Sequence, residues 1–309
     1  MAVALEVRKL RKRYGETVAL AGLDLQVARG EVFGFLGANG AGKTTFTKCV
    51  TGFVRPTSGE VEIMGVDAVK DPTLVAPHVG LVPDQYDFYS NLTGRQHLDF
   101  YGRLYGMPDE ERKARIEEVL DLVRMQERAD SRVKGYSHGM KQRICIAQAI
   151  LHKPDLIFFD EPTNGLDPKG AYELREMIRS LSRDGTTIFL SSHILPEVEQ
   201  VCDRVAIVQR GHLRTVGTLK QLRAETARGV GSVKVRVLNP SKRHVAIVGK
   251  LTSAVRLDGD VLEFQADEEG TAAAVAALVH DGAKVVSVSQ QQASLESIFL
   301  GINETEVVA

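Results

Sequence analysis

The apolar residues of this chain follow two different periods, and the change from one to the other divides the sequence into stretches. Residues 4–36 carry alternating and then continuous apolar positions, and the last run, 31–36, leads directly into a glycine-rich loop. Further continuous apolar runs occur at Val79–Val82, Leu156–Phe159, Thr187–Leu190 and Val205–Val208. Such runs are typical of strands buried on both faces with helices between them. We therefore predict an α/β core with a largely parallel sheet.

Residues 91–152 carry the helical period instead. Thr93 and Gln96 have the spacing of a capping box at a helix start. Two apolar stripes at helical spacing follow, namely Leu98, Tyr101 and Tyr105, and then Ile116, Val119, Leu120 and Val123. We therefore predict a helical insertion, at about residues 91–152, within the α/β domain.

The composition shifts after Gly229 and Gly231, which predicts a boundary between domains at 1–228 and 229–309. The second stretch begins with a predicted strand at 233–238 and a helix at 241–251. The turn Asp258-Gly259 then joins two strands, and a helix at 268–281 and a strand at 285–289 follow. This β-α-β-β-α-β order predicts a small α+β domain of the ferredoxin-like type.

Charge and cysteine content exclude several classes of function. The 39 basic and 40 acidic side chains give a formal charge of −1, so no basic surface favours a nucleic-acid partner. No apolar run reaches the roughly 18 residues of a membrane span, and no secretory signal is expected. Cys49, Cys145 and Cys202 are far apart and lie among apolar residues, so we expect buried thiols rather than a metal site or disulfides.

The glycine-rich segment that starts at Gly37 matches a P-loop between a predicted strand and a predicted helix. Its glycines allow several backbone N–H groups to point at one anion, and the following helix presents its positive end to the same phosphates. A lysine then supplies charge to the β- and γ-phosphates, and a threonine hydroxyl can bind Mg²⁺. The predicted nucleotide-binding residues of this loop are Gly37, Asn39, Gly40, Gly42, Lys43, Thr44 and Thr45.

A second site motif ends the apolar run at 156–159 with Asp160 and Glu161. A carboxylate at the end of a buried strand is held rigidly, so Asp160 is predicted to lie beside the metal. Glu161, one residue further on, is predicted to polarise the attacking water as a general base. A P-loop with an acidic strand end fits many NTPases, including kinases and GTPases.

Further motifs narrow the choice among these classes of NTPase. The segment Tyr136-Ser-His-Gly-Met-Lys-Gln-Arg143 resembles the signature loop of the ATP-binding cassette (ABC) family, in which Leu-Ser-Gly-Gly-Gln is commonest. Asn164-Gly-Leu-Asp167 and Ser191-Ser-His193 follow in the order typical of the family, and Tyr14 and Gln85 precede them. The resemblance covers about residues 3–220. It implies a P-loop NTPase core with an antiparallel β subdomain and the helical insertion. It also implies an ATPase that uses ATP and Mg²⁺.

The resemblance also implies roles within one chain. Tyr14 would stack on the adenine ring. Gln85 would reach the metal or the attacking water, so the implied metal-binding residues are Thr44, Gln85 and Asp160. His193 would contact the γ-phosphate and help to hold Glu161 and the water in line, which makes Glu161, His193 and Gln85 the implied catalytic residues.

Other implied roles involve a second ABC ATPase chain, with a homodimer expected. Ser137 and Gly139 would contact the γ-phosphate of ATP held by the second chain, and Asp167 would lie at the dimer seam. His138 and Met140 depart from the common Gly and Gln of the signature loop. Since Ser137 and Gly139 are intact, activity is expected to survive, with His138 as a tolerated residue at the rim or as a group that titrates near neutral pH and tunes ATP affinity.

The resemblance implies a subunit that energises export through separate integral membrane permease subunits, at the inner face of the cell membrane. The amino-acid sequence around 92–106 and at Ser294–Phe299 resembles that of the family branch that exports drugs, antibiotics and lipids or polysaccharides. An importer ATPase with an effector-binding C-terminal domain and a non-transport ABC ATPase are the alternatives. The aromatic stretch Tyr86–Arg95 fits a groove for a partner helix or ordinary packing of the helical insertion.

Overall fold

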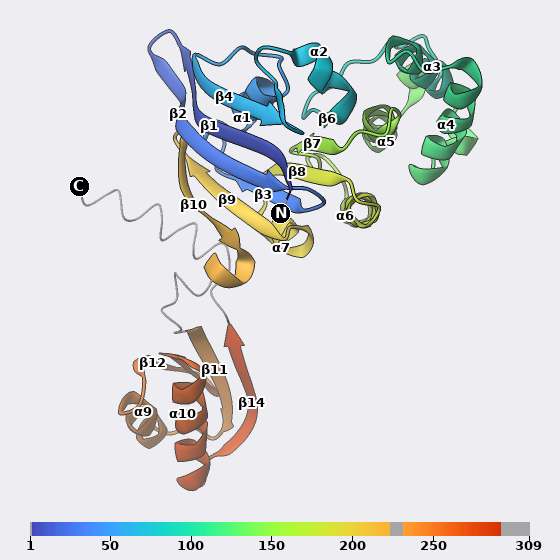
Figure 1. Ribbon diagram of the computed structural model, residues 1–309. Helices are drawn as coiled ribbons and strands as arrows, with labels where there is room; N and C mark the ends of the chain where they lie inside the picture. The colour runs from blue at the N-terminus through green and yellow to red at the C-terminus, as the bar shows by residue number, and fades with distance from the viewer. Residues whose placement is uncertain (1, 223–230, 292–309) are drawn as a thin grey trace. The chain divides into compact units, whose positions relative to one another are not determined.

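The computed structural model describes residues 2–222 and 231–291. The chain divides into two compact units, Met1–Val216 and Gly217–Ala309 (Figure 1). The predicted exporter-like segment Ser294–Phe299 lies outside the described residues.

The first unit is built on a six-stranded sheet with the order β10-β9-β3-β8-β7-β6. Its strands are β3 (Val32–Leu36), β6 (Val79–Val82), β7 (Leu156–Asp160), β8 (Thr187–Ser192), β9 (Arg204–Gln209) and β10 (His212–Thr218). The pairs β6–β7, β7–β8, β3–β8 and β3–β9 are parallel, which confirms the predicted parallel core. The strand β8 extends to Ser192, two residues beyond the predicted end, so both serines of the Ser-Ser-His motif belong to the sheet.

A second, antiparallel sheet of the same unit has the order β2-β1-β4-β5. It consists of β1 (Val3–Tyr14), β2 (Thr17–Ala28), β4 (Ser58–Ile63) and β5 (Val66–Asp67). The helix α1 (Lys43–Val50) contacts strands of both sheets. Five phenylalanine rings from β3, α1, β7 and β8 pack together at the centre of this core: Phe33, Phe35, Phe46, Phe158 and Phe189.

The helical insertion contains α3 (Gly94–Leu104), α4 (Asp109–Leu122) and α5 (His138–Ile150). Thr93 and Gln96 form the predicted capping box, because Thr93 accepts from the Gln96 N–H and the Gln96 side chain accepts from the Thr93 N–H. The short elements α2 (Pro72–Val75), η1 (Ala76–His78), η2 (Gln126–Arg128) and η3 (Val133–Gly135) lie around these helices in the sequence. The helices α6 (Pro168–Arg183) and α7 (Leu195–Val201) follow β7 and β8.

The second unit has the predicted order of elements. They are β11 (Gly231–Leu238), α9 (Lys242–Gly249), β12 (Ser253–Asp258), β13 (Val261–Ala266), α10 (Glu268–His280) and β14 (Lys284–Gln291). The sheet order is β12-β13-β11-β14 and every pair in it is antiparallel, which is the ferredoxin-like arrangement. None of the helices among the described residues is long and apolar enough to cross a membrane.

Candidate active site

The loop between β3 and α1 needs glycine for two reasons. Gly40 and Gly42 have φ angles of 82° and 107°, which side-chain-bearing residues rarely adopt. A Cβ on Gly42 would lie 2.6 Å from the Ala19 carbonyl oxygen, and a Cβ on Gly37 would lie 2.6 Å from the Val208 carbonyl oxygen. The loop is therefore pressed against neighbouring backbone in a shape that only glycine permits.

The start of α1 offers backbone donors beside this loop. The Phe46 N–H donates to the Gly42 carbonyl at 2.8 Å, as an early bond of the helix. The N–H groups of Lys43, Thr44 and Thr45 therefore lie in the first turn, where a helix has no acceptor for them. Together with the positive end of the helix dipole, these donors form a site for an anion such as phosphate.

Lys43 lies under the loop and is 5% exposed. Its ammonium donates to the Gly37 carbonyl at 2.7 Å and to the Ala38 carbonyl at 3.2 Å. It also lies 3.0 Å from Glu161 Oε1, although this oxygen lacks the alignment of a hydrogen bond. The charge is thus held close to the N–H groups of the loop, where phosphate oxygens would compete with these partners.

Glu161 is the centre of a short chain of contacts. It follows directly after β7 with a φ of 51°, a left-handed conformation that is uncommon for a residue with a side chain. Its N–H donates to the Ser191 carbonyl at 3.1 Å, which ties the turn to β8. On the side opposite Lys43, Glu161 Oε2 lies 2.8 Å from His193 Nδ1 and accepts from the His193 N–H at 3.3 Å.

Asp160 lies beside Thr44 and Ser191, and both hydroxyls hydrogen-bond to its carboxylate. Burial raises the pKa of Asp160, and these two hydrogen bonds oppose that rise. A carboxylate and a hydroxyl at one point are oxygen ligands that suit Mg²⁺. The part of the chain that the structure describes contains no group of three His, Cys, Asp or Glu residues fit for a metal.

The residues predicted to face a second chain are at helix starts. Ser137 is the N-cap of α5 and accepts from the Met140 N–H at 3.3 Å, and Gly139 lies in the first turn. Asp167 is the N-cap of α6 and accepts from the Gly170 N–H at 2.7 Å. Ser137 and Asp167 are exposed, so their contacts within the chain leave them accessible.

His138, which the sequence predicts to be a tolerated residue at the rim or a group that tunes ATP affinity, is exposed and has partners within the chain. Its Nε2 lies 3.1 Å from the Asn164 carbonyl oxygen, and its ring stacks on Tyr86 with centroids 6.1 Å apart. The Asn164 side chain in turn donates to Asp84 at 3.1 Å. His138 therefore connects the start of α5 with the loops that follow β6 and β7.

The contacts join five of the predicted residues into one network: Lys43, Thr44, Asp160, Glu161 and His193. Five others lie outside this network: Tyr14, Gln85, Ser137, Gly139 and Asp167. Tyr14 is 47% exposed, with the Lys12 ammonium 4.9 Å from its ring centroid, and Gln85 is exposed in the loop after β6.

Sequence reasoning missed two contributions to this site. Ser191 hydrogen-bonds to Asp160, and the only signal for it was its place two residues before His193 in the Ser-Ser-His motif. The Asp84–Asn164 bond joins residues from two loops that are 80 positions apart, and no local pattern in the sequence indicates such a pair.

Comparison with known proteins places these features in a family. The family model described as ABC transporter matches residues 20–164. The chain is 35% identical to the daunorubicin resistance ATP-binding protein DrrA3 of Streptomyces coeruleorubidus, over 96% of this chain and 95% of that protein. It is 32% identical to the Nod factor export ATP-binding protein I of Rhizobium meliloti, over 99% of this chain and 89% of that protein.

A solved structure titled as the ATP binding subunit of an ABC transporter is also similar. It has a TM-score of 0.67 and 33% identity, and the match covers 72% of this chain and 93% of that one. The alignment with DrrA3 spans nearly the whole of both chains, including their C-terminal parts. The chain therefore belongs to the family of ABC transporter ATP-binding proteins and is an ATPase.

Proposed function

We propose that this ATPase energises export through permease subunits that are separate chains in the membrane. The observation that carries the proposal is the similarity over nearly the full length, C-terminal unit included, to a daunorubicin resistance protein and a Nod factor export protein. The printed names of these two relatives, which refer to drug resistance and to export, suggest export as the function of this chain.

In the proposed reaction, the loop at 37–42 and the first turn of α1 bind the phosphates of ATP, and Lys43 places its charge on the β- and γ-phosphates. Glu161 accepts a proton from the attacking water, while His193 holds the Glu161 carboxylate in position and donates to the γ-phosphate. Mg²⁺, when bound, neutralises charge on the phosphates. The residues that we propose hold it are Thr44, Asp160 and Gln85.

The proposal includes a second ATPase chain, identical to the first. Ser137 and Gly139 lie at the exposed start of α5, which is a helix N-terminus of the kind that binds phosphate. Such a helix start in one chain completes the phosphate site of the other, so two chains enclose two ATP molecules. Hydrolysis then separates the chains, and the permease converts this cycle into movement.

A hollow in the first unit fits the permease partner. It has a volume of about 340 Å³ and is lined by the end of α1, by α2 and by α3, with Phe53, Tyr101 and Tyr105 among its residues. Phe53 is 72% exposed, which is unusual for a phenylalanine. By contrast, Phe88 packs on His97 and Tyr86 packs on His138, so these aromatics of the predicted groove contribute to packing of the helical insertion.

A photo-cross-linking experiment in native membranes tests this proposal. A photoreactive amino acid at Phe53 is expected to capture one integral membrane protein, identified by mass spectrometry as a chain with several membrane spans. The control is the same amino acid at Tyr172, which is 57% exposed on α6 and does not line the hollow. Equal capture from both positions, or capture of soluble proteins alone, would contradict a permease partner at this hollow.

A further inference from the structure

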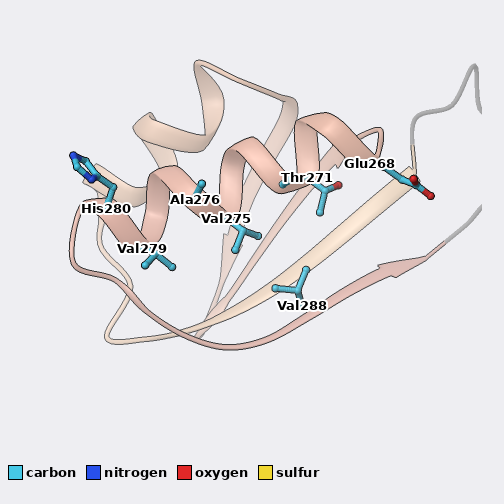
Figure 2. A pocket seen from close by; sticks show the side chains of 8 residues that line it. Glu268, Thr271, Val275, Ala276, Val279, His280 and Val288 are labelled. Carbon is cyan, nitrogen blue, oxygen red and sulfur yellow. The ribbon is translucent and has the colours of Figure 1, made fainter.

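The helix α10 carries two apolar faces. One face packs into the core of the second unit, where Ala274 and Leu278 are fully buried. The other face lines an open groove of about 870 Å³ beside β14. Its apolar residues are Ala272, Val275, Ala276 and Val279 from α10 and Val288 from β14, and Figure 2 shows the side chains of Val275 and Val279 directed towards the strand that carries Val288.

The groove is a continuation of the core that is left open. Val288 pairs with Val235, which is fully buried, and paired residues on neighbouring strands point to the same face of a sheet. Val288 is nevertheless 44% exposed, and Val279 is 56% exposed. Because β14 is an edge strand, the cover provided by α10 stops short of it, and one further apolar element would complete the layer.

The chain continues from the end of this groove. Gln291 pairs with Ser232, and the neighbouring Gly231 pairs with Ala266, so β14 ends level with the start of α10. Residues 292–309 lie outside the described residues, and their sequence begins Gln-Ala-Ser-Leu-Glu-Ser-Ile-Phe-Leu. Leu295, Ile298 and Phe299 have the i, i+3, i+4 spacing of one apolar helix face.

The length of the C-terminal segment also agrees with the length of the groove. Seven residues of helix, such as 294–300, span about 10 Å, and the seven-residue step from Ala272 to Val279 along α10 spans about the same length. The polar lining residues Glu268, Thr271 and His280 lie towards the two ends of the groove, so its middle has no convergent polar groups of the kind that orient a small ligand.

We propose that this groove is the docking site of the chain's own C-terminal segment, residues 292–309. Leu295, Ile298 and Phe299 pack against the valines of α10 and β14 and complete the apolar layer over the edge strand. The segment starts within a few residues of the groove, so its effective concentration there is high, and modest apolar contact suffices to hold it. This proposal is independent of the proposed transport function.

Disulfide trapping in the full-length chain tests where the segment docks. The variant Val279→Cys/Phe299→Cys is expected to form a cross-link within one chain, because docking brings the two Cα atoms within the roughly 7 Å that a disulfide requires. The chain's own thiols are buried at Cys49, Cys145 and Cys202 and do not compete. Leu257→Cys/Phe299→Cys is the control, because Leu257 lies on β12 at the other edge of the sheet.

The proposal predicts that the first pair cross-links within the chain on the order of tenfold faster than the control pair, given the tethered geometry. Equal rates for the two pairs overturn it. Cross-links that form between differently tagged chains also overturn it, and they assign the groove to a second copy instead.

Hydrogen exchange provides an independent readout. Phe299→Asp and Val279→Asp should each speed amide exchange over residues 271–280 on the order of tenfold, since each removes the cover of α10. The double variant should show no further increase. Leu257→Asp, which is 38% exposed and outside the groove, should leave this stretch unchanged. Exchange over 271–280 that does not respond to Phe299→Asp overturns the proposal.

Discussion

Both units of the chain pack helices on a sheet of apolar strands, yet their interiors contain different side chains. Among the described residues, the buried polar side chains all belong to the first unit: Lys43, Thr47, His97, Arg112, Gln142, Asp160, Glu161, Thr187, Ser191 and Ser192. The core of the second unit consists of valine, leucine, phenylalanine and alanine. Burial of a charged group costs free energy unless it is paired and hydrogen-bonded.

The difference indicates what each interior is for. In the first unit, Lys43, Asp160 and Glu161 lie at the carboxyl ends of β7 and near that of β3, where the ends of parallel strands meet a helix start. These buried charged groups make the fold less stable than an apolar core would make it. Such a loss of stability is typical of a functional site. The second unit carries no such cost, and its distinctive feature is an apolar groove on its surface.

The largest predicted effect concerns Glu161. Glu161→Gln keeps the shape of the side chain but removes the base, so ATP turnover should fall by on the order of 10²-fold or more while ATP binding is retained. Steady-state phosphate release and a nucleotide titration measure the two quantities. Glu176→Gln, on the exposed side of α6, is the control and should turn over normally. Undiminished hydrolysis by Glu161→Gln would remove this residue from the base role.

Lys43→Ala should weaken ATP binding by on the order of 10²-fold, because the ammonium is lost from beside the phosphates. It should also destabilise the nucleotide-free protein by about 3 kcal/mol, since the buried Glu161 carboxylate loses its cation. The double variant Lys43→Ala/Glu161→Gln should regain much of the stability and none of the affinity. Calorimetric titration and denaturant unfolding separate these effects, with the exposed Lys48→Ala as control. Unchanged ATP affinity would contradict the phosphate site.

The charge of the buried Asp160 carboxylate makes the stability of the first unit depend on pH. Burial raises the pKa of Asp160 in the folded state above its value in the unfolded chain. The charged carboxylate therefore destabilises the fold at a pH above the folded-state pKa, and this destabilisation is lost as the pH falls through that pKa. Asp160→Asn removes the charge and should stabilise the nucleotide-free protein at neutral pH, because the buried group no longer has to be ionised. It should also lose the stabilisation that MgATP adds. Thermal unfolding across pH, with and without MgATP, measures both, and an unaltered pH dependence would contradict the account.

His138→Gly restores the commoner residue of the family and removes the contacts to Asn164 and Tyr86. We expect the KM for ATP to rise a few-fold with kcat nearly unchanged, because the start of α5 is then less firmly held and about 1 kcal/mol of hydrogen bonding is lost. His138→Gln retains a donor and should recover much of the affinity. An equal fall in kcat for both variants would indicate a role beyond positioning.

The smallest predicted effect is on the second unit. A chain that ends after Gly229 should keep its ATPase rate within about twofold, because the first unit has its own core and contains the whole contact network of the site. Circular dichroism verifies that the shortened protein is folded. A folded but inactive protein would contradict the separation of the two units.

Local patterns predicted much of this molecule. The apolar runs gave β6 to β9, and the Thr93–Gln96 spacing gave the start of α3, because these signals depend on neighbours in the sequence. The short strands β4 and β5 and the strand β10 were not predicted, since β4 begins in Ser-Gly-Glu and β10 alternates exposed with half-buried residues. The P-loop residues and Asp160 were identified by motif.

Other features of the site depend on distant parts of the chain. The left-handed turn at Glu161 is fixed by its bond to Ser191, thirty positions away, and nothing around Glu161 in the sequence requires it. The bond of His138 to Asn164 likewise depends on where two loops meet. Such contacts follow from the packing of the sheet and the helical insertion, which a local pattern does not contain.

The central claim is that ATP bound at the loop 37–42 is enclosed by the start of α5 of a second chain. Light scattering of Glu161→Gln tests it directly, because this variant is expected to bind ATP without consuming it. We predict twice the monomer mass with MgATP, the monomer mass without it, and a monomer in both conditions for Glu161→Gln/Ser137→Arg, in which the arginine blocks the helix start. A Glu161→Gln protein that is saturated with ATP and remains a monomer would contradict the claim.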